Sequence, residues 1–440
     1  MEQHRNLKLV LSRFLRDKVL KHSKRFLLLA AIGALASVAL FIWRRDMPYP
    51  NIAGWDIFAH QTLFNEIQRG KLSLFPSQIS DTFLVTSYFP TFAVLVGVVG
   101  KALSFLSFAQ TYFVLDTIHF LATVALSAYA GWAATQRRLG ALAAGAFGAF
   151  IFETTVVQTS LFLTPQSLAA VLGILGVIFL LNKKNKAAAG FLSLSFLFHF
   201  VIGAGAIALA GATLLFQSLV GKEKGRGLVF ALGLGALLAG ILTNFLPFNL
   251  NPLQTAESRE FNFTLAQKWE LVQNWYGFLW VFYLAGVWAA LKKRQPRLDV
   301  VLALSLCSLA AVALFAPYAL KFYTLARFLV HAVAAGGVLY LLDGLRPMGR
   351  YALLALLVCI QITVFNVNQK NFKEAFAYQD TFTSASYDEI EAADYLRRNY
   401  GPKEGFLLVS DPATQHIFEA LSTVNTQGGS FATPETRQAV

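Results

Sequence analysis

Long apolar runs, separated by short polar segments, recur along most of the chain. One run, FLLLAAIGALASVALFIW, starts at Phe26, and the others are of similar or slightly shorter length. A helix needs about 20 apolar residues to cross a hydrocarbon core about 30 Å thick. The pattern therefore predicts a polytopic α-helical membrane protein with about eleven transmembrane helices. We expect the crossings at 26–43, 111–134, 139–157, 164–181, 187–202, 204–220, 228–246, 276–291, 298–316, 325–342 and 350–367.

The composition agrees with this class, because 56% of the 440 residues are hydrophobic and only 14% are charged. The first run follows a basic amphipathic segment, residues 1–25, and no small-residue cleavage site follows it. We therefore interpret it as a retained helix and not as a signal peptide. Both cysteines, Cys307 and Cys359, lie in apolar runs, which excludes a disulfide framework and offers no metal-binding spacing.

Positive charge is concentrated in the polar segments that follow alternate crossings. Residues 1–25, QRR at 136, NKKNK at 182, GKEKGRG at 221, KKRQPR at 292 and DGLRPMGR at 343 hold 22 of the 37 Lys and Arg. With Asp299 they hold only five of the 24 acids, so these segments carry +17 and the remainder −4. Such asymmetry marks the cytoplasmic ends of membrane helices. We expect a bacterial or archaeal plasma-membrane protein with a cytoplasmic N-terminus, an outer C-terminus and no nucleic-acid partner.

This topology predicts two long outer loops, at about 44–110 and 247–275. Residues 83–106, which contain Pro90 and Lys101, are expected to lie at or re-enter the outer face. The run 187–220 is divided at 203–205, since both its flanks are basic. The transmembrane domain spans 26–369, and 370–440 form a small extracytoplasmic α/β segment of two helices and a strand. That segment is too small to bury a core alone, so it either packs on the membrane domain or continues past Val440.

Ionisable residues inside or beside the predicted crossings all fall in the outer half of the membrane. Because polar groups at membrane depth are costly and usually face a cavity or a partner, we infer an outward-facing polar cleft. These residues are Asp116 and His119 in the second crossing, Glu153 in the third, His199 in the fifth, and Arg327 and His331 in the first turns of the tenth.

The first outer loop contains a further acid and imidazole. Asp56 and His60 are four residues apart, so on a helix they share one face, together with Leu63 and Ile67. An acid on such a face, just outside the first crossing, is a candidate functional residue. The alternative is an ordinary solvated loop acid.

Four short motifs together resemble the GT-C superfamily of membrane glycosyltransferases, which use polyprenyl-phosphate-linked sugars. They are GWDIFAH in the first outer loop, the aromatic-proline turn TSYFPTFAVLVG with Tyr88, the acid-bearing FETTVVQTSLFLTPQSLA, and the outer RFL before a terminal outer segment. The resemblance implies an inverting transfer of a sugar to a glycan, lipid or protein acceptor, with Asp56 as the catalytic carboxylate. It places Glu153 in the second acidic region.

Cationic side chains are needed to stabilise the departing phosphate. The candidates are Arg327, His331, Lys321 and Arg259, with His60, His199, Asp116, His119 and Tyr88 in supporting positions. Glu153 has no acidic neighbour, so a divalent cation such as Mg²⁺ or Mn²⁺ is one option and metal-free catalysis the other. Asp116 and His119 could instead be a structural pair, and Arg327 an interfacial anchor.

Two other function classes stay open. A transporter or flippase of a lipid-linked solute should show an internal repeat and polar residues in the inner half, and the sequence shows neither. A non-catalytic scaffold that binds polyprenyl lipid is the second alternative.

Overall fold

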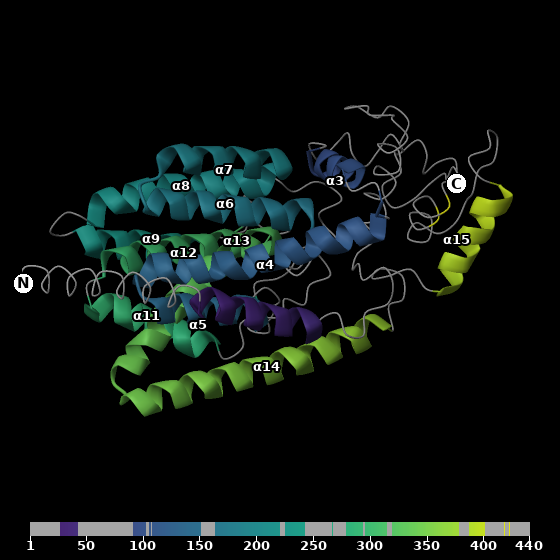
Figure 1. Ribbon diagram of the computed structural model, residues 1–440. Helices are drawn as coiled ribbons and strands as arrows, with labels where there is room; N and C mark the ends of the chain where they lie inside the picture. Colours follow the sequence, from purple (N-terminus) through teal and green to yellow (C-terminus); the bar gives the residue numbers. More distant parts are fainter. Residues whose placement is uncertain are drawn as a thin grey trace, which may run out of the picture.

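The structure, a computed structural model, describes residues 27–42, 91–102, 105–106, 108–150, 163–220, 225–242, 266, 279–293, 295–314, 319–377, 387–400, 418 and 422. The described residues are almost entirely helical and contain no strand (Figure 1). After a first helix at Leu27–Ile42, the helices are α3 Thr91–Ala102, α4 Phe108–Thr135, α5 Arg138–Phe150, α6 Pro165–Leu181, α7 Asn185–Phe198, α8 Phe200–Val220, α9 Gly225–Leu242, α11 Leu279–Lys293, α12 Pro296–Leu314, α13 Ala319–Asp343, α14 Pro347–Ala377 and α15 Tyr387–Asn399.

Four described helices are long and apolar enough to cross a membrane, and they belong to α4, α8, α12 and α13. Shorter apolar helices include Leu27–Ile42, α5 and α6. A helix overlaps each of the predicted crossings, but the number of true crossings, about eleven, stays a prediction. At the C-terminal end, α15 is the first of the two expected helices. The expected strand at 405–410 lies outside the described residues.

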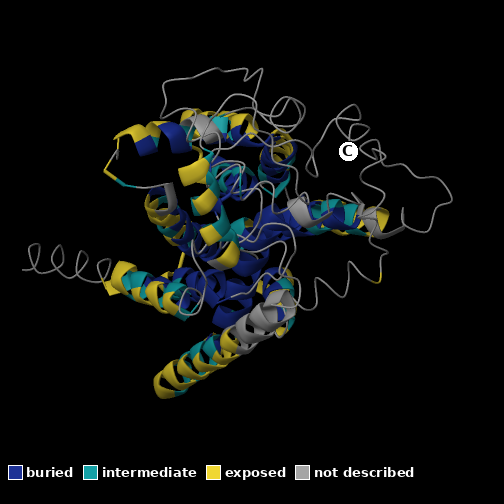
Figure 2. Ribbon diagram, turned by 90° about the vertical axis from the view of Figure 1, so that its right-hand side faces the viewer, coloured by how far each residue is buried: buried dark blue, intermediate teal, exposed yellow. Residues whose placement is uncertain are grey.

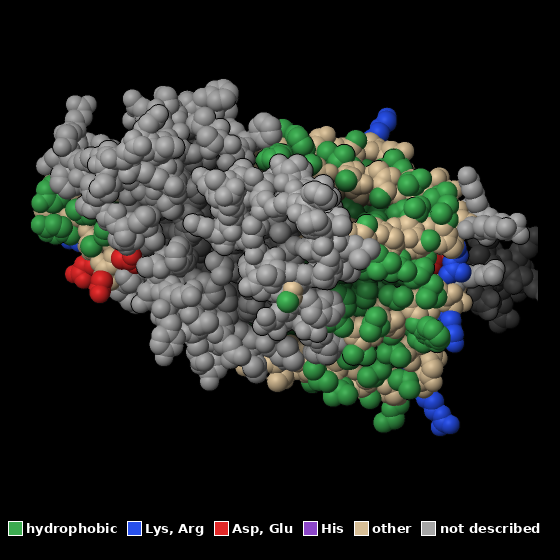
Figure 3. Space-filling model, turned by 180° about the vertical axis from the view of Figure 1, so that it is seen from behind, with side chains coloured by type: hydrophobic (Ala, Val, Ile, Leu, Met, Phe, Trp, Pro, Cys, Tyr) green, Lys and Arg blue, Asp and Glu red, His purple; other side chains and the backbone are tan. Residues whose placement is uncertain are grey.

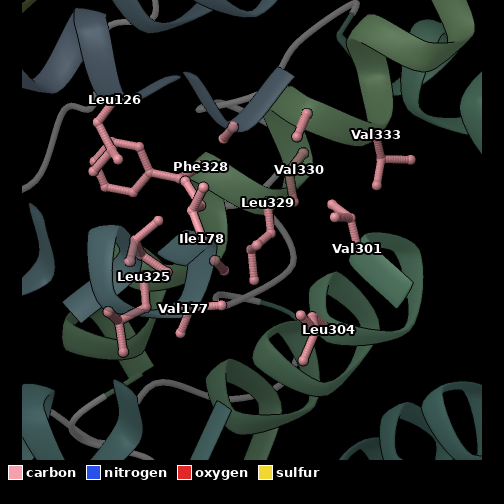
Figure 4. Packing of buried hydrophobic residues seen from close by; sticks show 14 of the residues in the cluster. Leu126, Val177, Ile178, Val301, Leu304, Leu325, Phe328, Leu329, Val330 and Val333 are labelled. Atoms are coloured by element: carbon pink, nitrogen blue, oxygen red, sulfur yellow. The ribbon is translucent and has the colours of Figure 1, made fainter. Parts of the chain in front are cut away.

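Helix α13 forms the centre of the bundle. It packs against α11, α12, α4, α5, α6 and α8, and 89% of its most apolar stretch is buried. Figure 4 shows Leu325, Phe328 and Leu329 of α13 packed among Val177 and Ile178 of α6, Val301 and Leu304 of α12 and Leu126 of α4. By contrast, α14 lies at the edge of the bundle with an exposed outer face (Figure 2).

Two glycines allow α11 and α13 to approach each other closely. A Cβ atom added at Gly337 would overlap the carbonyl oxygen of Phe282, and one added at Gly286 would overlap that of Val333. Small residues at such crossings let helix backbones pack tightly where no hydrophobic effect drives association between lipid-exposed helices. The positions of these two glycines in the sequence did not predict the close crossing of α11 and α13.

Polar turns at one end of the bundle are joined by ion pairs. Asp343, at the end of α13, binds both Arg137 and Lys293, at 2.8 and 2.7 Å. Asp299 binds Arg226, which also donates a hydrogen bond to the Ala290 carbonyl. Figure 3 shows Lys and Arg side chains at this end, next to a broad hydrophobic surface. Arg297 also donates a hydrogen bond to Asn182, so the five basic segments that follow residue 130 share one end, which we call the basic end.

The predicted break at 203–205 is wrong, since the boundary between α7 and α8 lies earlier in the sequence. The break is at His199, and Gly203 lies inside α8. A Cβ at Gly203 would overlap the backbone of Phe196, so this glycine permits close packing of α7 against α8 and does not interrupt a helix. Helix α3, expected within 83–106, has 12 residues, about 18 Å, which is too short to span the membrane.

Candidate functional site

Six buried polar side chains lie along the contact between α4 and α13. Both helices run toward the basic end, because Ser127 contacts His331 and Arg137 contacts Asp343. Residues four apart share a helix face. The six residues, which we call the polar ladder, are His119, Thr123 and Ser127 of α4 and Tyr323, Arg327 and His331 of α13, each at most 3% exposed.

Side chains of the ladder interact across the two helices. The His331 Nδ1 atom lies 3.4 Å from the Ser127 hydroxyl, and the His331 ring packs against Phe147 of α5. Arg327 is close enough to His119 and His331 to act on both imidazoles electrostatically. Neither ring nitrogen of His119 has a hydrogen-bond partner among the described residues. An unpaired imidazole at membrane depth is costly, so the His119 ring is suited to accept a further polar partner.

Helix α4 also fixes the segment that leads into α6. The Leu163 amide donates to the Asp116 carboxylate at 2.6 Å, and the Tyr112 hydroxyl donates to the Leu163 carbonyl. Thr164 then caps α6 by a reciprocal pair of hydrogen bonds with Ser167. Asp116 thus holds the chain just after the stretch that carries Glu153. No hydrogen bond joins the His119 ring to Asp116 among the described residues, so the two are not the simple pair that their spacing suggested.

His199 has a local structural role. It occupies the residue between α7 and α8, is 2% exposed, and its Nδ1 accepts a hydrogen bond from the Ile202 amide at 3.3 Å. The imidazole therefore caps the first turn of α8, where backbone amides have no partner within the helix.

The structure describes only part of the predicted site. The polar ladder brings together Arg327, His331 and His119. Lys321 lies in α13, but the placement of its side chain is not described. The remaining candidates lie outside the described residues; they are Asp56, His60, Tyr88, Glu153 and Arg259.

Arg327 and His331 lie farther from the start of their helix than predicted. Helix α13 begins at Ala319, not at 325, so these residues lie about 12 and 18 Å along the helix and not in its first turns. Lys321 lowers the hydropathy of the first turn, but hydrogen bonding continues the helix through it. His331 is therefore near the middle of α13.

Sequence reasoning missed three members of the ladder: Thr123, Ser127 and Tyr323. A signal was present, since 119, 123 and 127 repeat the four-residue spacing of 323, 327 and 331. Only the packing of α4 on α13 makes the two rows face each other.

A buried guanidinium beside imidazoles and hydroxyls is suited to bind an anion. Arginine donates several hydrogen bonds in a planar fork that matches phosphate oxygens. The described residues contain no group of three His, Cys, Asp or Glu side chains that could hold a metal ion. The cluster therefore offers the cationic and hydroxyl donors that an anion requires.

Comparison with known proteins found no matching family model and no matching curated protein sequence. Solved structures do match. The archaeal oligosaccharyltransferase AglB from Archaeoglobus fulgidus, in complex with an inhibitory peptide and a dolichol-phosphate, aligns with a TM-score of 0.60 at 14% identity, over 93% of this chain and 65% of that one. This chain has the fold of an archaeal oligosaccharyltransferase.

Two further Archaeoglobus fulgidus oligosaccharyltransferase structures agree. One, tethered to an acceptor peptide with the NVT sequon, aligns with a TM-score of 0.60 at 13% identity, over 94% of this chain and 64% of that one. The other, a complex with Zn and sulfate, aligns with a TM-score of 0.60 at 14% identity, over 92% and 62%. The chain thus spans less than two thirds of the length of these proteins. The resemblance to GT-C membrane glycosyltransferases is confirmed at the level of the fold.

Proposed function

We propose that the protein is a membrane glycosyltransferase that moves a sugar from a polyprenyl-phosphate-linked donor to an acceptor on the extracytoplasmic face. The observation that carries the proposal is the fold, which is shared over more than nine tenths of the chain with an oligosaccharyltransferase solved with dolichol-phosphate and with an acceptor peptide. The buried Arg327 supports it, because a lipid phosphate is the natural anion for a cation at this depth.

The reaction needs a base and a stabilised leaving group. Asp56 takes the proton from the acceptor hydroxyl or amide, whose oxygen or nitrogen attacks the anomeric carbon from the face opposite the phosphate. The bond from that carbon to the phosphate oxygen breaks, its electron pair stays on the phosphate, and the sugar configuration is inverted. The cations assigned to the departing phosphate are Arg327, His331, Lys321 and Arg259.

The supporting roles follow from position. Glu153 binds the acceptor or assists Asp56, and Asp116 holds the start of α6 in place through Leu163. His60 and Tyr88 belong to the first outer loop with Asp56. His119 lines the phosphate site beside Arg327. Glu153 is the residue that would hold a divalent cation, Mg²⁺ or Mn²⁺. It lies outside the described residues, so we assign no reaction step to a metal.

A transfer assay on the purified protein in lipid tests the proposal. A panel of radiolabelled polyprenyl-phosphate sugars is supplied with a crude envelope acceptor, for the wild type and for Asp56→Asn. We expect Asp56→Asn to lower turnover by about 10²–10⁴-fold, the usual contribution of a general base. Asp388→Asn, which neutralises an exposed acid in the first turn of α15, is the matched control and should transfer at the wild-type rate.

Retained turnover in a folded Asp56→Asn variant would remove this residue from catalysis. No transfer by the wild type, with lipid binding unchanged by the mutation, would identify the scaffold instead. One observation favours the flippase as second candidate, since the polar ladder reaches Ser127 and His331 near the middle of the bundle. Passage of the labelled lipid across the bilayer, without transfer to acceptor, would establish that function.

A further inference from the structure

The turn between α6 and α7, at the basic end, has an unusual backbone. Lys183 adopts a φ of 59°, the left-handed region that a Cβ atom disfavours. Glycine commonly occupies this position after a helix, because it has no such penalty. A lysine here keeps a positive charge at the turn in spite of the strain. Strained positions of this kind often serve binding.

Hydrogen bonds from neighbouring helices fix a second cation at the same turn. The Arg297 guanidinium, at the start of α12, donates to the Asn182 side-chain oxygen at 2.9 Å. The Asn182 amide donates in turn to the Tyr129 hydroxyl of α4 at 3.2 Å, and Gln217 of α8 donates to the Leu181 carbonyl at 3.2 Å. Three neighbouring helices, α4, α8 and α12, therefore meet at the turn, and Asn182 holds Arg297 beside it. We call Lys183, Lys184 and Arg297 the basic hub.

Two acids at this end, among the residues that the structure describes, are engaged by other cations. Asp343 binds Arg137 and Lys293, and Asp299 binds Arg226. No carboxylate contacts the basic hub among the described residues. The hub therefore has a net positive charge that an external anion can neutralise.

The position of the basic hub relative to the membrane indicates which kind of anion it binds. The Lys184 amine lies 5.5 Å from the centre of the Phe179 ring, at the end of an apolar helix. Lys and Arg side chains lie where the hydrophobic surface ends in Figure 3, which is the level of lipid head groups. Basic pockets between transmembrane helices at this level bind anionic head groups.

We propose that the basic hub binds the phosphate of an anionic phospholipid head group. Lys183 and Lys184 supply point charges, and Arg297 supplies a guanidinium already oriented by Asn182. The bound phosphate offsets the strain at Lys183 and links α6 to α12 through one ligand. The proposal uses none of the residues assigned to sugar transfer and does not depend on the proposed function.

The test measures lipid retention by native mass spectrometry and thermal unfolding of the full chain in detergent. Phosphatidylglycerol, phosphatidylcholine and soluble glycerol 3-phosphate are added separately to the wild type, Lys183→Gly, Lys184→Gln and Lys292→Gln. Lys292 is the matched control, since it lies at the same end but its amine lies 4.7 Å from the centre of the Trp288 ring. We expect phosphatidylglycerol to be retained about fivefold less for each hub charge removed. Lys292→Gln should behave as the wild type.

Lys183→Gly separates binding from folding. Glycine relieves the strained φ, so with phosphatidylcholine this variant should unfold at or above the wild-type temperature, while losing the extra stabilisation by phosphatidylglycerol. The proposal is overturned if phosphatidylglycerol stabilises the wild type no more than phosphatidylcholine does, or if Lys292→Gln loses as much retention as the hub variants. Equal stabilisation by glycerol 3-phosphate would assign the hub to a soluble phosphate and overturn the lipid assignment.

Discussion

Arg327 is the side chain whose surroundings most restrict its role. It is 3% exposed in the most buried helix of the bundle, and its Cζ lies 4.3 Å from the centre of the Phe328 ring. A charge held there needs an anion or a polar neighbour to offset desolvation. If that anion is the donor phosphate, Arg327→Ala should raise the KM for donor about 10- to 100-fold, the range for a lost charge-assisted hydrogen bond. The KM for acceptor should change little, as steady-state kinetics with each substrate varied in turn would measure.

Arg327→Lys is the informative companion variant. Lysine keeps the charge but not the planar fork, so it should recover only part of the donor affinity. A thermal unfolding scan of both variants shows whether the loss comes from folding. Donor and acceptor constants that rise equally, or an unchanged donor constant, would contradict a phosphate role and indicate an interfacial or structural arginine.

At the scale of a helix, the close crossing of α11 and α13 determines how tightly the centre of the bundle packs. A methyl group at Gly337 would meet the backbone of Phe282 and Gly286, neither of which can rotate away. Gly337→Ala should therefore lower the free energy of unfolding by about 1–3 kcal/mol, the usual penalty for overpacking a core. The measurement is the thermal unfolding midpoint in a fixed detergent.

Gly235→Ala in α9 provides the control for this substitution. No atom lies within 4 Å of a Cβ added there, and alanine is the better helix former, so its midpoint should equal or exceed that of the wild type. Equal midpoints for the two variants would show that α11 and α13 can separate at no energetic cost, contrary to the packing described here.

The helices themselves could be predicted from the sequence, because an apolar run of membrane length has few alternatives to a helix. Their ends could not. The break at His199 depends on an imidazole that caps α8. Helix α13 starts at Ala319, so the charged Lys321 lies within its first turn. Neither feature alters the hydropathy in a way that marks a boundary.

For the whole molecule, the candidate site was predictable only in part. Polar residues in apolar runs indicated His119, Arg327 and His331, since each is costly at membrane depth. Their assembly was not predictable, because Ser127 and His331 are 204 residues apart and meet only through the packing of α4 on α13. The catalytic carboxylates, Asp56 and Glu153, stay predictions, as both lie outside the described residues.

The charge asymmetry makes a prediction about the orientation of the whole protein. The basic segments, far apart in sequence, are joined at one end by the ion pairs of Asp343 and Asp299. Helix α14 starts at that end and runs for 31 residues, about 46 Å, which is more than the thickness of a hydrocarbon core. It therefore carries the chain to the opposite end, where α15 lies (Figure 1).

A membrane-impermeant maleimide applied to intact cells tests this orientation. In a background with Cys307 and Cys359 replaced by serine, Tyr395→Cys in α15 should be labelled from outside, since Tyr395 is 57% exposed. Lys184→Cys, exposed at the basic end, should be labelled only after the cells are opened, because basic segments are retained in the cytoplasm. Labelling of Lys184→Cys in intact cells would reverse the orientation and place the basic hub outside. The donor phosphate would then have to reach Arg327 from the cytoplasmic leaflet.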